Sequence, residues 1–201
     1  MKFRYLAAGV IAIATAASPL AFAAVDGKAL VTKYKTTSAV VNLQAEVGAF
    51  TYSLTAQNFD DMDGVQQGIV SVSKSGFDPV TGAFFTGGVT CQGPAFSNTV
   101  KVNKTTGVSS VNVLLDPTAP DCTGFNSAAV TIAITGVPIG NYQKSETGMS
   151  TIRYGGGAVD KTSFQSESFD ENFSGSIGYY SGAFTGNAQA SKITSRTRVV
   201  P

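Results

Sequence analysis

The chain has 201 residues, with 14 Lys and Arg, 13 Asp and Glu, two cysteines and neither histidine nor tryptophan. The lack of histidine excludes a Ser-His-Asp or Cys-His catalytic site and an imidazole-bound metal. The nearly balanced charge predicts no general affinity for nucleic acid or for anionic membranes.

The first 23 residues, "MKFRYLAAGVIAIATAASPLAFA", have the three parts of a bacterial-type secretory signal. Lys2 and Arg4 precede an apolar stretch, and the segment ends in Ala21-x-Ala23. The apolar stretch is shorter than the roughly 20 residues that span a bilayer. We therefore expect cleavage after Ala23 and an exported protein, located in the periplasm, at the cell surface or outside the cell.

The mature chain, 24–201, is long enough for one domain and contains no linker that would divide it. It has 12 basic and 13 acidic residues, a formal charge of −1. No other segment has the length and hydrophobicity of a transmembrane helix.

Short stretches with alternating apolar residues recur along the mature chain and predict β-strands with one buried face. "SAVVNLQAEVGAFTYSLTAQ" indicates two strands with a turn near Gly48, and "GIVSVSK", "TVKVN", "SSVNVLLD" and "SAAVTIAITGV" indicate four more. The clusters "KSGFDPVTG", "NKTTG", "GVPIGN" and "GGG" are typical of turns. The predicted core includes the alternating residues Val111, Val113, Val130, Ile132 and Ile134.

This pattern predicts an all-β protein, an antiparallel β-sandwich of jelly-roll or Ig-like topology, with a small β-barrel as the alternative. An eight-stranded outer-membrane barrel also fits an exported chain of this size. The missing tryptophan, the cysteine pair and strands that look shorter than the roughly 9 to 11 residues of such barrels weigh against it.

"NFDDMDG" places Asp60, Asp61 and Asp63 ahead of a glycine, and oxygen-rich loops of this kind can bind calcium. The stretch does not fit an EF-hand, because Phe59 and Val70 stand where that motif needs acids. We expect a solvated acidic turn, with calcium as the minor alternative and the only cofactor considered.

Cys91 and Cys122 are the only cysteines. In an oxidising compartment they are expected to pair, closing a loop that stabilises the fold by roughly 3 to 4 kcal/mol. Pro117 and Pro120 are expected to end the strand that precedes Cys122.

"SFQSESFDENFSG" contains Glu167, Asp170 and Glu171, and as a strand it places Glu167 and Glu171 on one face and Asp170 on the other. Two residues four apart on a strand are about 13 Å apart, too far for the paired carboxylates of a glycosidase. We expect an amphipathic strand with an acidic solvent face.

The candidate binding residues are the aromatic residues Tyr154, Tyr179, Tyr180 and Phe184, because exposed rings beside glycines can stack on sugars. Adjacent tyrosines on a strand point to opposite faces, so one of Tyr179 and Tyr180 is expected in the core.

The sequence therefore predicts a non-enzymatic protein with a structural, adhesive or protein-interaction role. The expected partners are another protein or like subunits, with polysaccharide next and nucleic acid excluded. A carbohydrate-binding module is the alternative, and an outer-membrane barrel is the second alternative.

Overall fold

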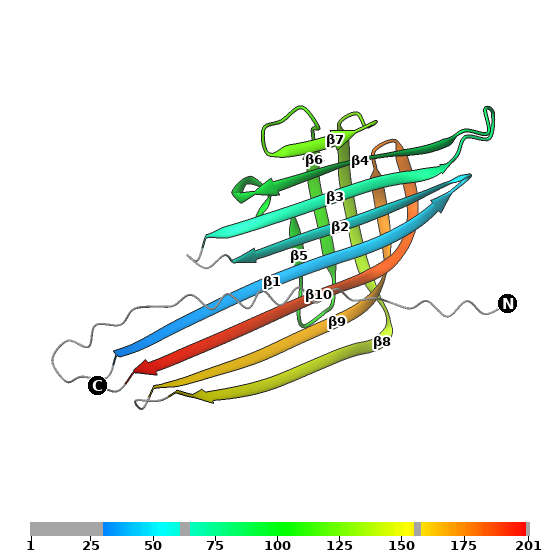
Figure 1. Ribbon diagram of the computed structural model, residues 1–201. Coiled ribbons are helices and arrows are strands. Elements are labelled where there is room, and N and C mark those ends of the chain that lie inside the picture. The colour runs from blue at the N-terminus through cyan, green and yellow to red at the C-terminus, as the bar shows by residue number, and fades with distance from the viewer. Residues whose placement is uncertain (1–29, 61–64, 155–157, 200–201) are drawn as a thin grey trace.

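The computed structural model describes residues 30–60, 65–154 and 158–199, so the predicted secretory signal lies outside the described residues. Within these ranges the chain forms ten strands and one short 3-10 helix (Figure 1). They are β1 (Leu30–Val47), β2 (Phe50–Asp60), β3 (Gln66–Phe77), β4 (Phe84–Gly93), η1 (Pro94–Phe96), β5 (Val100–Val102), β6 (Ser109–Leu115), β7 (Cys122–Phe125), β8 (Val130–Arg153), β9 (Val159–Ile177) and β10 (Tyr180–Val199). None of the described residues forms a helix long and apolar enough to cross a membrane.

The strands form one antiparallel sheet in the order β5-β6-β8-β9-β10-β1-β2-β3-β4-β7, which confirms the predicted all-β class. The sheet curls, so that β5 contacts β1, β2 and β10, and β6 contacts β1 and β4. Figure 1 shows β5 and β6 running crosswise to the long strands β1 to β4. The apolar core lies between these two parts of the curled sheet.

Alternate residues of the strands around the core are buried, as the period-two pattern predicts. Of the predicted core residues, Val111, Ile132 and Ile134 are buried, and Val113 and Val130 are partly buried against the same cluster. The alternation of apolar residues therefore correctly predicted the core face of β6 and of the first part of β8.

The expectation of short strands is wrong, because β1, β8, β9 and β10 have 18, 24, 19 and 20 residues. "GVPIGN", predicted as a turn, lies inside β8, where the pairing with β9 shifts between Pro138 and Gln143. Pro138 has no N–H for the ladder, and Gly140 has a φ of 69°. This segment interrupts the pairing within β8 without ending the strand.

Four strands continue beyond the core as an extension that we name the arm (Figure 1). The arm consists of residues 30–37 of β1, 144–153 of β8, 159–165 of β9 and 191–198 of β10, paired in the order β8-β9-β10-β1. Each arm side chain that the structure describes is exposed or half-buried. We name the rest of the described chain the body.

Candidate functional site

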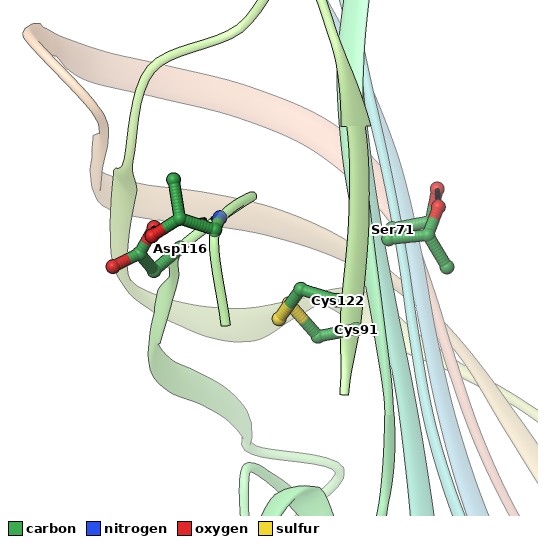
Figure 2. Close-up of a disulfide and its surroundings, with 6 residues drawn as sticks. Ser71, Cys91, Asp116 and Cys122 are labelled. Atoms are coloured by element: carbon green, nitrogen blue, oxygen red, sulfur yellow. Dashed lines mark hydrogen bonds between the residues drawn. A yellow bond between two sulfur atoms is a disulfide. The ribbon is translucent and has the colours of Figure 1, made fainter. Parts of the chain in front are cut away.

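The two cysteines form a disulfide within the body (Figure 2). Cys91 of β4 and Cys122 of β7 are direct partners in the ladder, with their Cα atoms 4.0 Å apart. Ser71 lies on the other side of the sheet from the disulfide, where its hydroxyl forms a hydrogen bond with the hydroxyl of Thr90. The disulfide links β7, the short strand at one edge of the sheet, to β4. It leaves neither cysteine with a free thiol.

Glu171 of β9 is the most deeply buried ionisable group among the described residues, with no exposed surface. Its Oε2 accepts a hydrogen bond from the Ser109 hydroxyl of β6, and its Oε1 has no hydrogen-bond partner among the described residues. Gly136 of β8 makes room for this carboxyl, because a Cβ there would lie 1.9 Å from Oε2. Burial raises the pKa of Glu171 to about 7, and the Ser109 bond opposes that shift.

The acidic solvent face predicted for β9 is corrected by this arrangement. Glu167 and Glu171 lie on the core side together with Phe169 and Phe173, and only Asp170 faces solvent. The two acids share the parity of the two phenylalanines, which the sequence analysis overlooked. Glu171 has no exposed surface, so it cannot reach a substrate in this conformation.

The structure does not bring the four predicted binding aromatics together. Tyr154 follows β8 at the arm and is 52% exposed, and Tyr179 is fully exposed in the turn at the other end of β9. Phe184 is buried, and Tyr180 packs against the core and stacks on Tyr52 with ring centroids 6.2 Å apart. Tyr179 is exposed in a turn and not on a strand, whereas Tyr180 is partly buried at the start of β10. Phe184 is buried and cannot contact a ligand at the surface.

The candidate calcium ligands are only partly described, because Asp61 and Asp63 lie outside the described residues. Asp60 ends β2 and accepts hydrogen bonds from the N–H and hydroxyl of Thr37, at 2.8 and 2.9 Å. Among the residues that the structure covers, no three Cys, Asp or Glu side chains gather in a metal-binding arrangement.

Two strand edges of the arm have no ladder partner among the described residues. β8 pairs with β6 only as far as Gly136, so 145–153 pairs with β9 alone. β1 pairs with β2 only from Ser38 onward, so 30–36 pairs with β10 alone. Each edge presents a row of backbone donors and acceptors.

The ladder registers place seven cations on the face of the arm that continues the core side of the sheet. We name this surface the basic face, and its residues are Lys33, Lys35, Arg153, Lys161, Lys192, Arg196 and Arg198. They are half of the 14 Lys and Arg of the whole sequence. In the described part of the chain none of the seven forms a salt bridge.

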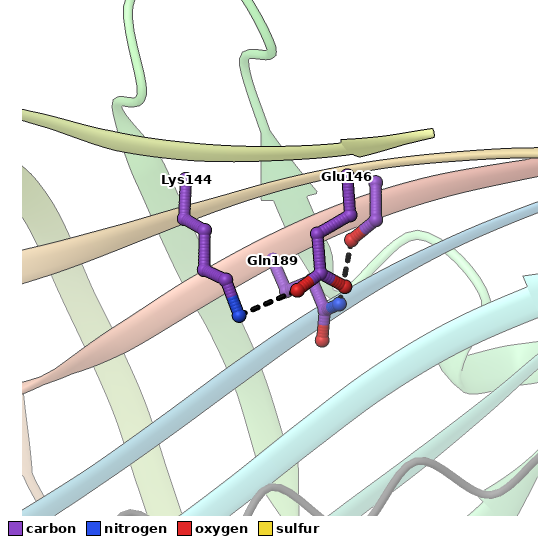
Figure 3. A network of polar contacts seen from close by, with 4 residues as sticks. Lys144, Glu146 and Gln189 are labelled. Carbon is purple, nitrogen blue, oxygen red and sulfur yellow. Dashed lines mark hydrogen bonds and ion pairs between the residues drawn. The ribbon is translucent and has the colours of Figure 1, made fainter. Parts of the chain in front are cut away.

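The acids of the arm, Glu146 and Asp160, lie on its opposite face, where Figure 3 shows Glu146 beside Lys144. Asp160 accepts hydrogen bonds from Ser195 and Thr197, and Glu146 forms a 2.5 Å ion pair with Lys144. The period of two therefore places seven cations on the basic face, while the acids of the arm lie on the opposite face together with Lys144. A net charge near zero hides this separation, and the alternation of cations with hydroxyl residues in "TKYKTT" and "SKITSRTR" is the sequence signal that reveals it.

These features define an antiparallel all-β protein with a disulfide-linked body and a charged arm. No protein-family model and no curated protein matches the chain. Among solved structures, a Nitrosomonas europaea protein described provisionally as AttH aligns with 83% of this chain and 51% of its own, at 15% identity and a TM-score of 0.33. The chain thus spans about half the length of that protein. At this TM-score the alignment supports no inference about fold or function.

Proposed function

We propose that this protein is an exported structural or adhesive protein that associates with like subunits through the edges of its arm, and that it is not an enzyme. The observation that carries the proposal is the edge of β8 from Ser145 to Arg153, which has no ladder partner among the described residues. Natural proteins usually block such edges with charged side chains, proline, a bulge or a short strand, and this edge has only Glu146 and Arg153 as charged residues. This edge has nine consecutive residues without proline, all exposed, including Met149 and Ile152.

The direction of the second edge supports like subunits as the partner. Three antiparallel steps separate β8 from β1 across the arm, so the two edges run in opposite directions. A second copy in the same orientation can therefore place its 30–36 edge antiparallel to 145–153, which extends the sheet from one subunit to the next.

Sedimentation velocity of the mature protein over a wide concentration range tests this association. In an antiparallel strand, successive N–H groups point alternately to the two sides, so Ser150→Pro and Thr151→Pro form a matched pair. One substitution removes a donor from the free edge, and the other breaks the β8-β9 ladder and lowers thermal stability. We expect the variant with unchanged stability to lose association. A protein that stays monomeric at every concentration, or a stable variant that still associates, contradicts the proposal.

A further inference from the structure

We infer that the basic face binds a linear acidic polysaccharide, one that carries carboxylate or sulfate groups. This inference goes beyond the proposed self-association, because it concerns a face of the arm and not its edges. It rests on the arrangement of the cations, on the side chains between them and on the shape of the surroundings.

The cations are placed where they repel one another. Lys33, Arg196 and Lys161 are direct neighbours across β1, β10 and β9, at the roughly 4.8 Å spacing of adjacent strands. Like charges directly opposite each other in a sheet destabilise it. Arg153 and Arg198 flank Val159 in the next row of the same face. A bound polyanion would remove this repulsion and release the counterions that the face otherwise holds.

The rows of the basic face follow the arm for roughly 20 Å, since alternate residues on a strand are about 6.8 Å apart. The positions between the cations hold hydroxyl and amide side chains that can hydrogen-bond to sugar hydroxyls. These residues are Thr147 and Thr151 of β8, Ser163 and Gln165 of β9, and Thr194 of β10. The face therefore offers both charge and polar contacts along a chain-like ligand.

Two observations favour a polysaccharide over other polyanions. No aromatic side chain lies on the described basic face, whereas proteins that bind single-stranded nucleic acid stack bases on aromatic rings. β5 and β6 pack on the same side of the sheet at the base of the arm, against β1. A planar membrane would meet this second layer before it lay flat on the arm, whereas a flexible chain can run beside it.

Equilibrium binding of the mature protein to dextran sulfate and polygalacturonate tests the inference, with uncharged dextran, oligothymidine and phosphatidylglycerol vesicles as comparison probes. The triple variant Lys33→Gln, Lys161→Gln, Arg196→Gln removes the central row. The charge-matched control is Lys101→Gln, Lys104→Gln, Lys144→Gln, whose three lysines are exposed outside the basic face. Measuring binding at protein concentrations at which sedimentation shows only monomer keeps binding separate from self-association.

We expect saturable binding to at least one acidic polysaccharide that weakens as salt rises, falling about tenfold or more in the central-row variant and little in the control. Several results would overturn the inference: no binding to either acidic polysaccharide, equal loss in both triple variants, or equal binding to uncharged dextran. Tighter binding to oligothymidine or to the vesicles would also overturn it, and would identify a nucleic acid or a membrane as the partner.

Discussion

Strands β1, β8, β9 and β10 run through both the body and the arm, but their side chains follow different patterns in the two regions. In the body half of β9, Phe169 and Phe173 fill the core, and in the arm half the same face carries Lys161 and Ser163. The ladder continues through both halves without a break in register between β9 and β10. Backbone pairing therefore extends the sheet beyond the buried core. The face that is apolar in the body carries cations and hydroxyl side chains in the arm.

The comparison implies that stability resides in the body. Replacing both disulfide cysteines by serine is expected to lower the free energy of unfolding most. The two cysteines are 31 residues apart in the sequence, and their bridge lies within the core. We expect a loss of about 2–5 kcal/mol in the free energy of unfolding. Urea denaturation of the mature protein measures it.

The matched substitution in the arm is Ser163→Ala, at an exposed position. It should change the free energy of unfolding by no more than about 0.5 kcal/mol. Two reactive thiols in the native, unreduced protein would refute the bridge, and a large loss in Ser163→Ala would refute the division between body and arm.

A pH-dependent term of intermediate size is expected from Glu171. The pKa of Glu171 in the folded protein, about 7, lies above the ordinary value of 4.5. The contribution of Glu171 to the free energy of unfolding is therefore fully present below pH 4.5 and is lost as pH rises toward 7. The difference corresponds to about 3 kcal/mol. Glu171→Gln cannot ionise, and so its free energy of unfolding should lack this decline.

Two aspartates have lowered pKa values, so their contribution to stability changes with pH in the direction opposite to that of Glu171. The Val80 and Thr81 N–H groups lower the pKa of Asp78, and the Thr118 hydroxyl and N–H lower that of Asp116. Their stabilisation is lost as pH falls through those lowered values. Urea titrations between pH 4.5 and 8 therefore isolate Glu171. Parallel pH profiles for wild type and Glu171→Gln would show that the buried carboxyl does not control stability.

The body was predictable from the sequence and the arm was not, for a physical reason. Val111, Ile132 and Ile134 alternate with polar residues, and that contrast in hydrophobicity reveals both the strand and its buried side. The arm parts of β1 and β10 place Lys and Arg among Thr and Ser, so a search for alternating hydrophobic residues does not detect them. "GVPIGN" has turn composition, yet β8 continues past it because its pairing with β9 resumes at Gln143.

The site residues follow the same division. Cys91 and Cys122 were identified because only one pairing was possible. The basic face required the registers of four strands, which bring together residues from Lys33 to Arg198. Phe184 was misplaced because glycine neighbours suggested a surface turn, whereas its face of β10 points into the core.

The smallest expected effect probes repulsion within the arm. Arg196→Thr leaves an uncharged residue between Lys33 and Lys161, which are otherwise both opposed by a cation. We expect the arm to become more stable by about 0.2–1 kcal/mol at low salt. Native-state hydrogen exchange of arm amides is the suitable measurement, because local opening of the arm need not involve the body.

The salt dependence of exchange and a control variant on the opposite face of the arm test whether relief of repulsion causes the stabilisation by Arg196→Thr. The gain from Arg196→Thr should shrink at high salt, where exposed charges are screened. Lys144→Thr removes an exposed cation that is paired with Glu146, so it relieves no repulsion and should not slow exchange. Faster exchange in Arg196→Thr, or equal slowing in both variants, would mean that the cations of the basic face do not repel one another. A polyanionic ligand would then gain no free energy from relieving repulsion between these cations.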